Sequence, residues 1–183
     1  YPVSILIDEG SASASEILAS ALKESEGYDV IGTTSYGKGS VQTVLPLEDG
    51  SQLKLTRFKW LTPNGNWIHQ KGVKPTIVIK QPDYFYASPL TVKKPLVFDS
   101  VDADIANAQL LLKGSGFDPK RTDGYFSQET EQAVKAFQQS KGLSVTGQID
   151  QHTAKALNEA VQKAVQDPKN DRQLAKALEV ITK

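Results

Sequence analysis

The sequence predicts an α/β segment followed by a small all-α three-helix domain in one chain of 183 residues. Three observations support this prediction. Residues 1–32 follow the order strand, helix, strand, which implies a crossover joining a parallel pair of strands. Three prolines interrupt any regular period in residues 81–99. From Ser100 onward, apolar residues recur at helical spacing, and this length suffices for one large domain or two small ones.

The first unit of the chain has the pattern of a βαβ motif. An apolar run at residues 3–7 is typical of a strand buried in a parallel sheet. From about Ser13, apolar residues recur at helical spacing. The helix should end near Gly27, since glycine is the usual residue just past a helix end. Residues 29–32 then predict a second short strand.

A β-hairpin is predicted next, because a turn signal at residues 48–51 separates two extended segments. Alternation in its second strand predicts that Leu53, Leu55 and Phe58 point inward. Residues 76–80 are expected to form the last strand of the first domain.

These patterns divide the chain into a domain at residues 1–80, a proline-containing linker at residues 81–99 and a helical domain at residues 100–183. The helical domain should contain three helices and one more short helix at residues 172–181, with apolar residues on one face.

Within the helical domain, one turn-plus-cap pattern occurs twice. Asp123-Gly124 precedes a helix opened by Ser127, and Thr146-Gly147 precedes a helix capped by Asp150. Burial preferences favour core positions for the aromatic residues Phe126 and Phe137.

Composition excludes several classes of function. The 21 basic and 21 acidic residues cancel, which argues against nucleic acid held by bulk charge. The absence of cysteine excludes disulfides, thiolate metal sites and cysteine nucleophiles. His69 and His152 lack metal-ligand spacing, so we expect no metal and no cofactor. No signal peptide is recognisable, and no apolar run is long enough to cross a bilayer.

Two short motifs supply the parts of a serine nucleophile with a lysine base. Residues 10–17 read Gly-Ser-Ala-Ser-Ala-Ser-Glu-Ile, and residues 37–42 read Gly-Lys-Gly-Ser-Val-Gln. Serine needs a base to remove its proton, and a lysine serves only when burial away from carboxylates keeps it neutral. Because residues 33–45 contain no acid, we hypothesise that Lys38 is buried and takes a serine proton.

Structural alternatives exist for each of these residues. Ser13 and Glu16 have the spacing of a helix capping box. Ser11 and Ser15 are rival nucleophiles. Lys38 has the alternative of a solvated loop position, although the glycines on both sides of it favour close packing. Gln42 has the alternative of an exposed strand position.

The two motifs together resemble the catalytic core of the C-terminal processing peptidases, also called tail-specific proteases. The resemblance implies that Ser13 is the nucleophile, Lys38 the general base and Gln42 a residue that places the lysine; the separation of 25 positions (38 − 13) fits the family. It also implies that the Ala14 N–H meets the oxyanion, with a second donor upstream. The upstream half of the core and the PDZ domain are missing here, so the fragment alone is expected to be inactive.

Residues 102–160 resemble the peptidoglycan-binding domain often appended to cell-wall enzymes. Matching positions include the Asp123-Gly124 pair and the Phe137-Gln138 pair. Since sugar binding commonly uses exposed aromatics, Asp123 and Tyr125 are the candidate ligand-binding residues.

The expected function is therefore that of a serine endopeptidase cutting protein or peptide substrates at the cell envelope, tethered to peptidoglycan. Its location would be extracytoplasmic, with any membrane association arising only from the missing N-terminal region. The alternative is a catalytically degenerate wall-binding or scaffolding protein.

Overall fold

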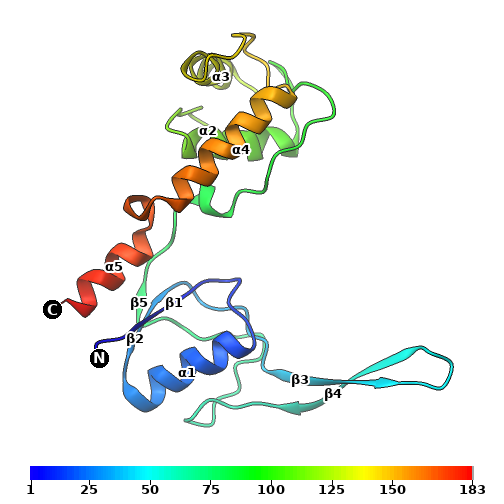
Figure 1. The fold of residues 1–183 in the computed structure, drawn as a ribbon, viewed down its shortest axis with the longest axis vertical. Coiled ribbons are helices and arrows are strands. Elements are labelled where there is room, and N and C mark those ends of the chain that lie inside the picture. The colour runs from blue at the N-terminus through cyan, green and yellow to red at the C-terminus, as the bar shows by residue number, and fades with distance from the viewer. Residues whose placement is uncertain (183) are drawn as a thin grey trace. The chain divides into compact units, whose positions relative to one another are not determined.

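A computed structural model describes residues 1–182, which form two compact units (Figure 1). Unit 1 contains Tyr1–Gln81 together with the chain from Arg172 onward, and unit 2 contains Pro82–Asp171. The chain therefore leaves unit 1, builds unit 2 and returns. The predicted end of the first domain at residue 80 agrees with this division, whereas the predicted linker and the assignment of the chain after Asp171 to the helical domain do not.

Unit 1 is organised around a three-stranded parallel sheet in the order β1-β2-β5. Its strands are β1 (Ser4–Ile7), β2 (Asp29–Gly32) and β5 (Ile77–Val78), and helix α1 (Ala14–Glu26) connects the first two. This arrangement confirms the predicted βαβ unit. Helix α1 ends as expected, with Gly27 in the left-handed conformation at φ 70°. The small core of this unit contains Ile7, Ala19, Val30, Ile68 and Val73.

A separate antiparallel hairpin consists of β3 (Ser40–Pro46) and β4 (Gln52–Lys59). The hairpin is confirmed, but the prediction that Leu53, Leu55 and Phe58 point inward is wrong. Their side chains are 43%, 40% and 62% exposed, and every residue of β4 is exposed. Among residues 1–182, no second layer covers this two-stranded sheet, so alternation along β4 has no core to face (Figure 1).

The predicted C-terminal helix forms as α5 (Arg172–Ile181), but it belongs to unit 1. It packs against β1 and β2, and Gln173 Nε2 donates a hydrogen bond to the Ile79 carbonyl oxygen at 3.0 Å. The Arg172 N–H donates to Gln81 Oε1 at 3.0 Å, close to where the chain leaves the unit. The expected domain 100–183 therefore loses its last helix, because an amphipathic helix can pack on either unit and its sequence does not say which.

Unit 2 is built on three α-helices: α2 (Ala103–Gly114), α3 (Gln128–Ser140) and α4 (Gln151–Gln166). Two short 3₁₀ segments, η1 (Asp83–Tyr86) and η2 (Pro168–Asn170), lie near its ends. Phe126 and Phe137 are fully buried, as expected. The main core residues are Leu90, Val92, Ile105, Ala108, Leu111, Leu112, Phe126, Ala133, Val134, Phe137, Ile149, Ala154, Leu157 and Val161.

Most of the predicted linker is part of unit 2. Leu90 and Val92 belong to its core, and Tyr84 packs against the same cluster. The Leu90 N–H donates to Asn158 Oδ1 at 2.8 Å, and Asn158 Nδ2 donates back to the Leu90 carbonyl at 2.9 Å. The segment at residues 81–99 therefore contributes core residues to unit 2, although its prolines interrupt regular secondary structure.

The repeated turn-plus-cap pattern is present in both copies. In the first copy, the buried Gln109 of α2 accepts from the Gly124 N–H at 3.0 Å and donates to the Tyr125 carbonyl at 2.8 Å. The second copy uses the buried Gln138 of α3, which accepts from the Gly147 N–H at 3.0 Å. Each glutamine amide thus satisfies backbone groups of the turn that follows its helix.

Candidate active site

Ser13 lies on a sharp turn between β1 and α1. It is the N-cap residue of α1 and has φ 55° and ψ −113°, a backbone conformation that non-glycine residues rarely adopt. The preceding turn is held by Asp8, whose Oδ1 accepts from the Gly10 N–H and the Ser11 N–H at 3.0 Å each. A nucleophile on a strained strand-to-helix turn is a recurring active-site device, and such strain concentrates at functional sites.

Glu16, one turn into α1, has a fully buried side chain that joins the two sequence motifs. Its Oε2 accepts from the Ser13 N–H at 2.9 Å and the Lys38 N–H at 2.8 Å. Its Oε1 accepts from Ser35 Oγ at 2.5 Å and the Gly37 N–H at 2.6 Å. Burial raises the pKa of Glu16, but these hydrogen bonds outweigh it and hold the pKa below the ordinary 4.5. Glu16 is therefore a carboxylate at neutral pH.

The glycines on both sides of Lys38 are required by close backbone packing. Gly37 has φ 89°, and a Cβ there would lie 2.9–3.0 Å from backbone nitrogens of residues 70–72. A Cβ on Gly39 would lie 2.8 Å from the His69 backbone nitrogen. The predicted close packing of the glycine-flanked loop is confirmed.

Two tryptophans hold the lysine loop by its carbonyls. Trp60 Nε1 donates to the Lys38 carbonyl oxygen at 2.9 Å, and Trp67 Nε1 donates to the Gly39 carbonyl oxygen at 2.8 Å. The backbone of this loop is therefore fixed on two sides, by Glu16 and by the indole groups. Sequence reasoning missed both tryptophans, because nothing in their local sequence marks them as partners of the loop.

The Lys38 side chain is exposed, so the hypothesis of a buried lysine is wrong for this chain. It lines an open pocket of about 760 Å³ with Gln42, His69 and Tyr36. Within residues 1–182, no hydrogen bond joins Ser13 Oγ to Lys38 Nζ. The loop backbone is held by hydrogen bonds to Glu16 and from two indole groups, while nothing in the described part of the chain covers the amine.

Gln42 and Ala14 are the other two residues predicted for the catalytic site. Gln42 lies beside a bulge in β3, and its Nε2 is 3.4 Å from Thr56 Oγ1 on an exposed face. Ala14 is the first residue of α1, where N–H groups have no partner within the helix. Gln42 thus shares a pocket with Lys38, and the Ala14 amide directly follows Ser13.

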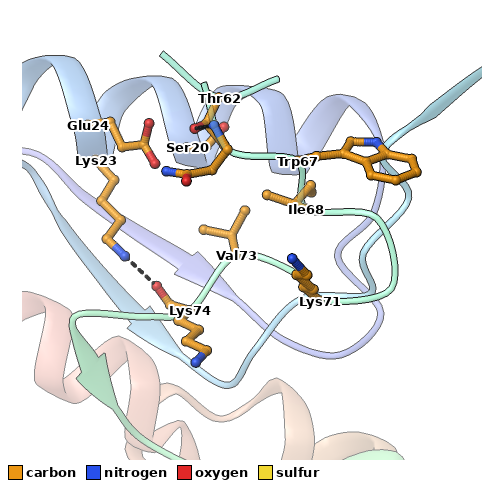
Figure 2. Close-up of a pocket in the computed structure, with 11 residues that line it drawn as sticks. Ser20, Lys23, Glu24, Thr62, Trp67, Ile68, Lys71, Val73 and Lys74 are labelled. Atoms are coloured by element: carbon orange, nitrogen blue, oxygen red, sulfur yellow. Dashed lines mark hydrogen bonds between the residues drawn. The ribbon is translucent and has the colours of Figure 1, made fainter. Parts of the chain in front are cut away.

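A second pocket, of about 380 Å³, lies between α1 and the segment at residues 62–74 (Figure 2). In it, Lys23 Nζ donates to the Lys74 carbonyl oxygen at 2.8 Å. Glu24, also from α1, accepts from the Asn64 N–H at 2.8 Å. None of the predicted catalytic residues lines this pocket.

In unit 2, the structure brings Asp123 and Tyr125 into one surface cluster with Arg121, in which Asp123 is exposed and the other two residues are half-buried. Arg121 donates to both oxygens of Asp123 at 2.7 and 2.5 Å, and its guanidinium lies 4.7 Å from the centre of the Tyr125 ring. Hydrogen bonds from Arg121 lower the pKa of Asp123 to about 2. The Tyr125 hydroxyl donates to Asp99 Oδ1 at 2.9 Å, a contact that raises the pKa of Tyr125.

Neither a metal site nor a membrane span is formed by the part of the chain that the structure describes. In residues 1–182, His, Asp and Glu side chains do not gather in groups of three that fit a metal ion. Within the same residues, no helix has both the length and the apolar character needed to cross a bilayer.

Comparison with known proteins adds two family matches. A family model described as peptidase family S41 matches residues 1–79, and one described as a putative peptidoglycan binding domain matches residues 101–157.

Among curated relatives, carboxy-terminal processing protease CtpB of Bacillus subtilis (strain 168) is 59% identical over 97% of this chain and 37% of its own length. CtpA of the same strain is 39% identical over 100% of this chain and 38% of its own length. A probable CtpA-like serine protease of Staphylococcus aureus (strain N315) is 39% identical over 98% of this chain and 36% of its own length. A solved photosystem II D1 C-terminal processing protease is 42% identical, with a TM-score of 0.42, over 43% of this chain and 20% of that chain. The chain spans little more than a third of the curated relatives' length.

Proposed function

Because the chain combines a segment of peptidase family S41 with a peptidoglycan-binding domain, we propose that its complete gene product is a Ser-Lys endopeptidase of the carboxy-terminal processing type. One observation carries this proposal. The strained turn at Ser13 and the loop of Lys38 bind the same buried carboxylate, so the two motifs form one structural unit.

The proposed chemistry assigns one role to each residue. Ser13 Oγ attacks the carbonyl carbon of the scissile bond while the Lys38 amine accepts its proton. The Ala14 N–H donates to the oxyanion that forms. The C–N bond then breaks as Lys38 returns the proton to the leaving nitrogen, and water hydrolyses the acyl ester. Gln42 orients the amine without adding a negative charge.

The substrates we propose are proteins or peptides at the cell envelope. Relatives of this chain are named carboxy-terminal processing proteases, and this chain covers 37% of the first of them. The activity is therefore assigned to the complete gene product. The 183-residue chain alone is expected to be inactive, because Lys38 is exposed in it.

An active-serine probe tests the nucleophile. A fluorophosphonate is expected to label the complete gene product at Ser13, and labelling should disappear in Ser13→Ala, because only a serine with a base is a competent nucleophile at neutral pH. Mass spectrometry of the labelled peptide is the measurement.

The neighbouring serines provide matched controls for this experiment. Ser11→Ala and Ser15→Ala should keep the label, since neither residue has the strained backbone of Ser13. A label located on Ser11 or Ser15, or one that survives Ser13→Ala, would refute the assignment.

Unit 2 is proposed to tether the enzyme to peptidoglycan, which would place it at the cell envelope. The surface cluster of Arg121, Asp123 and Tyr125 offers a half-buried aromatic ring and paired charges for contacts with sugars and their peptide stems. We expect Tyr125→Ala to lower retention of the 183-residue chain on purified peptidoglycan about tenfold in a sedimentation assay, the loss of roughly 1.4 kcal/mol.

An exposed tyrosine of unit 1 serves as the control in the same assay. Tyr36→Ala removes a side chain of the same type at a position distant from Tyr125 in the sequence. It should leave retention on peptidoglycan unchanged. Equal retention of Tyr125→Ala and the parent chain would exclude Tyr125 from the binding surface.

One observation favours the alternative of a catalytically degenerate wall-binding protein. Lys38 is exposed and forms no hydrogen bond with Ser13 in residues 1–182. Failure of the complete gene product to react with the fluorophosphonate, together with intact retention on peptidoglycan, would support that alternative.

A further inference from the structure

Glu16 is an ionised group in a place where charge is costly. Its side chain is 0% exposed, and no ion pair balances it within residues 1–182. A buried carboxylate is tolerated only when strong hydrogen bonds replace its water. All four of its hydrogen bonds are 2.9 Å or shorter.

A helix cap accounts for only one of these four contacts. The bond from the Ser13 N–H belongs to the capping box of α1. The other three donors, Ser35, Gly37 and Lys38, come from the loop that follows β2, about 20 residues away in the sequence. A capping glutamate exposed to solvent would serve the helix equally well, so the burial and the loop contacts call for another explanation.

We propose that Glu16 is a positioning residue that fixes the nucleophile turn against the base loop and thereby sets the rate of acylation. This inference rests on the proposed Ser-Lys chemistry. Oε2 bonds the backbone N–H groups of Ser13 and Lys38 at once, so one atom sets how far apart these two backbones lie.

The other carboxylate oxygen extends the connection to the rest of the unit. Oε1 accepts hydrogen bonds from Ser35 Oγ and the Gly37 N–H. Ser35 Oγ in turn accepts from the Val73 N–H at 2.7 Å. The lysine loop is thereby bound both to the start of α1 and to the segment that packs behind the loop. A displacement of about 1 Å between reacting groups costs on the order of 100-fold in rate.

Glu16→Gln in the complete gene product tests this role. The amide has the same shape, but its NH₂ cannot accept, so two of the four donors lose their partner. We expect kcat on a peptide substrate to fall about 100-fold, with KM within about threefold of the parent. If the role of Glu16 were purely structural, the replacement would lower the thermal unfolding temperature. At temperatures well below unfolding, it would then not lower kcat selectively while leaving KM unchanged.

Glu24→Gln is the matched control. Glu24 lies on the same helix and also accepts a loop N–H, that of Asn64, but it does not contact the lysine loop. Its replacement should leave kcat within about twofold of the parent.

A second variant covers the case in which Glu16→Gln does not fold. Ser35→Ala keeps the carboxylate and removes one donor to it, and it should lower kcat several-fold at unchanged KM. A kcat within twofold of the parent in either folded variant would overturn the positioning role. If Ser13→Ala also retains full turnover, the Ser-Lys proposal itself fails; if Ser13→Ala is inactive, only the inference about Glu16 is lost.

Discussion

Replacing Lys38 with alanine in the complete gene product is expected to lower kcat by about 10³- to 10⁴-fold, because the proposed mechanism then lacks its general base and acid. Lys38→Arg should fail in the same way, since a guanidinium keeps the positive charge but does not release a proton at neutral pH. Steady-state hydrolysis of a peptide substrate measures both effects.

A neighbouring lysine controls for nonspecific loss of charge. Lys71 belongs to the segment packed behind the Gly37 loop, and its exposed side chain lines the pocket of Figure 2 rather than that of Lys38. Lys71→Ala should keep kcat within about twofold of the parent. Turnover of Lys38→Ala within tenfold of the parent would rule out Lys38 as the base.

Phe137→Ala is expected to destabilise unit 2 by about 3–5 kcal/mol, the usual cost of removing a buried aromatic side chain. Phe137 is fully buried in α3 and forms an edge-on contact with Phe117, with ring centres 5.5 Å apart. Urea unfolding of the 183-residue chain, followed by far-UV circular dichroism, measures the shift. Both tryptophans, Trp60 and Trp67, lie in unit 1, so their fluorescence reports on that unit separately.

An exposed phenylalanine of the same unit gives the comparison. Phe98 is 52% exposed, so Phe98→Ala should change the unfolding free energy by only about 0.5 kcal/mol. A loss below about 1 kcal/mol for Phe137→Ala would contradict the observed core.

The fold was predictable where the signal is local. The apolar run at β1, the helical spacing of α1 and Gly27 at its end lie within one stretch of sequence, and the structure confirms all three. The inward face of β4 was not predictable, because alternation shows that a strand has two faces and does not show whether a core lies against one of them.

The predicted end of the first domain at residue 80 agrees with the structure, whereas the linker and the last helix were assigned wrongly for a related reason. Leu90 and Val92 lie among prolines that indicate irregular backbone, and irregular backbone is compatible with burial in a core. The apolar stripe of α5 fits any apolar surface of suitable shape. Only long-range packing assigns it to the sheet of unit 1.

At the candidate site, the motifs name the residues proposed for catalysis, but most of the surroundings of these residues could not be predicted from the motifs. The tight packing of Gly37 and Gly39 follows from glycine on both sides of one lysine. The exposure of Lys38 did not follow, since burial depends on segments distant in sequence. Glu16 was predicted only as a cap, because its contacts with the lysine loop leave no local signature.

The return of the chain at Arg172 has a genetic consequence. A premature stop codon anywhere within residues 82–171 would delete α5 as well, and would strip a covering helix from β1 and β2. Excision of residues 82–171 in frame would spare that helix, since the Arg172 N–H already bonds the Gln81 side chain and a short splice would join the two ends. Exchange of residues 82–171 for another module during evolution is therefore easier by internal replacement than by loss of the C-terminus.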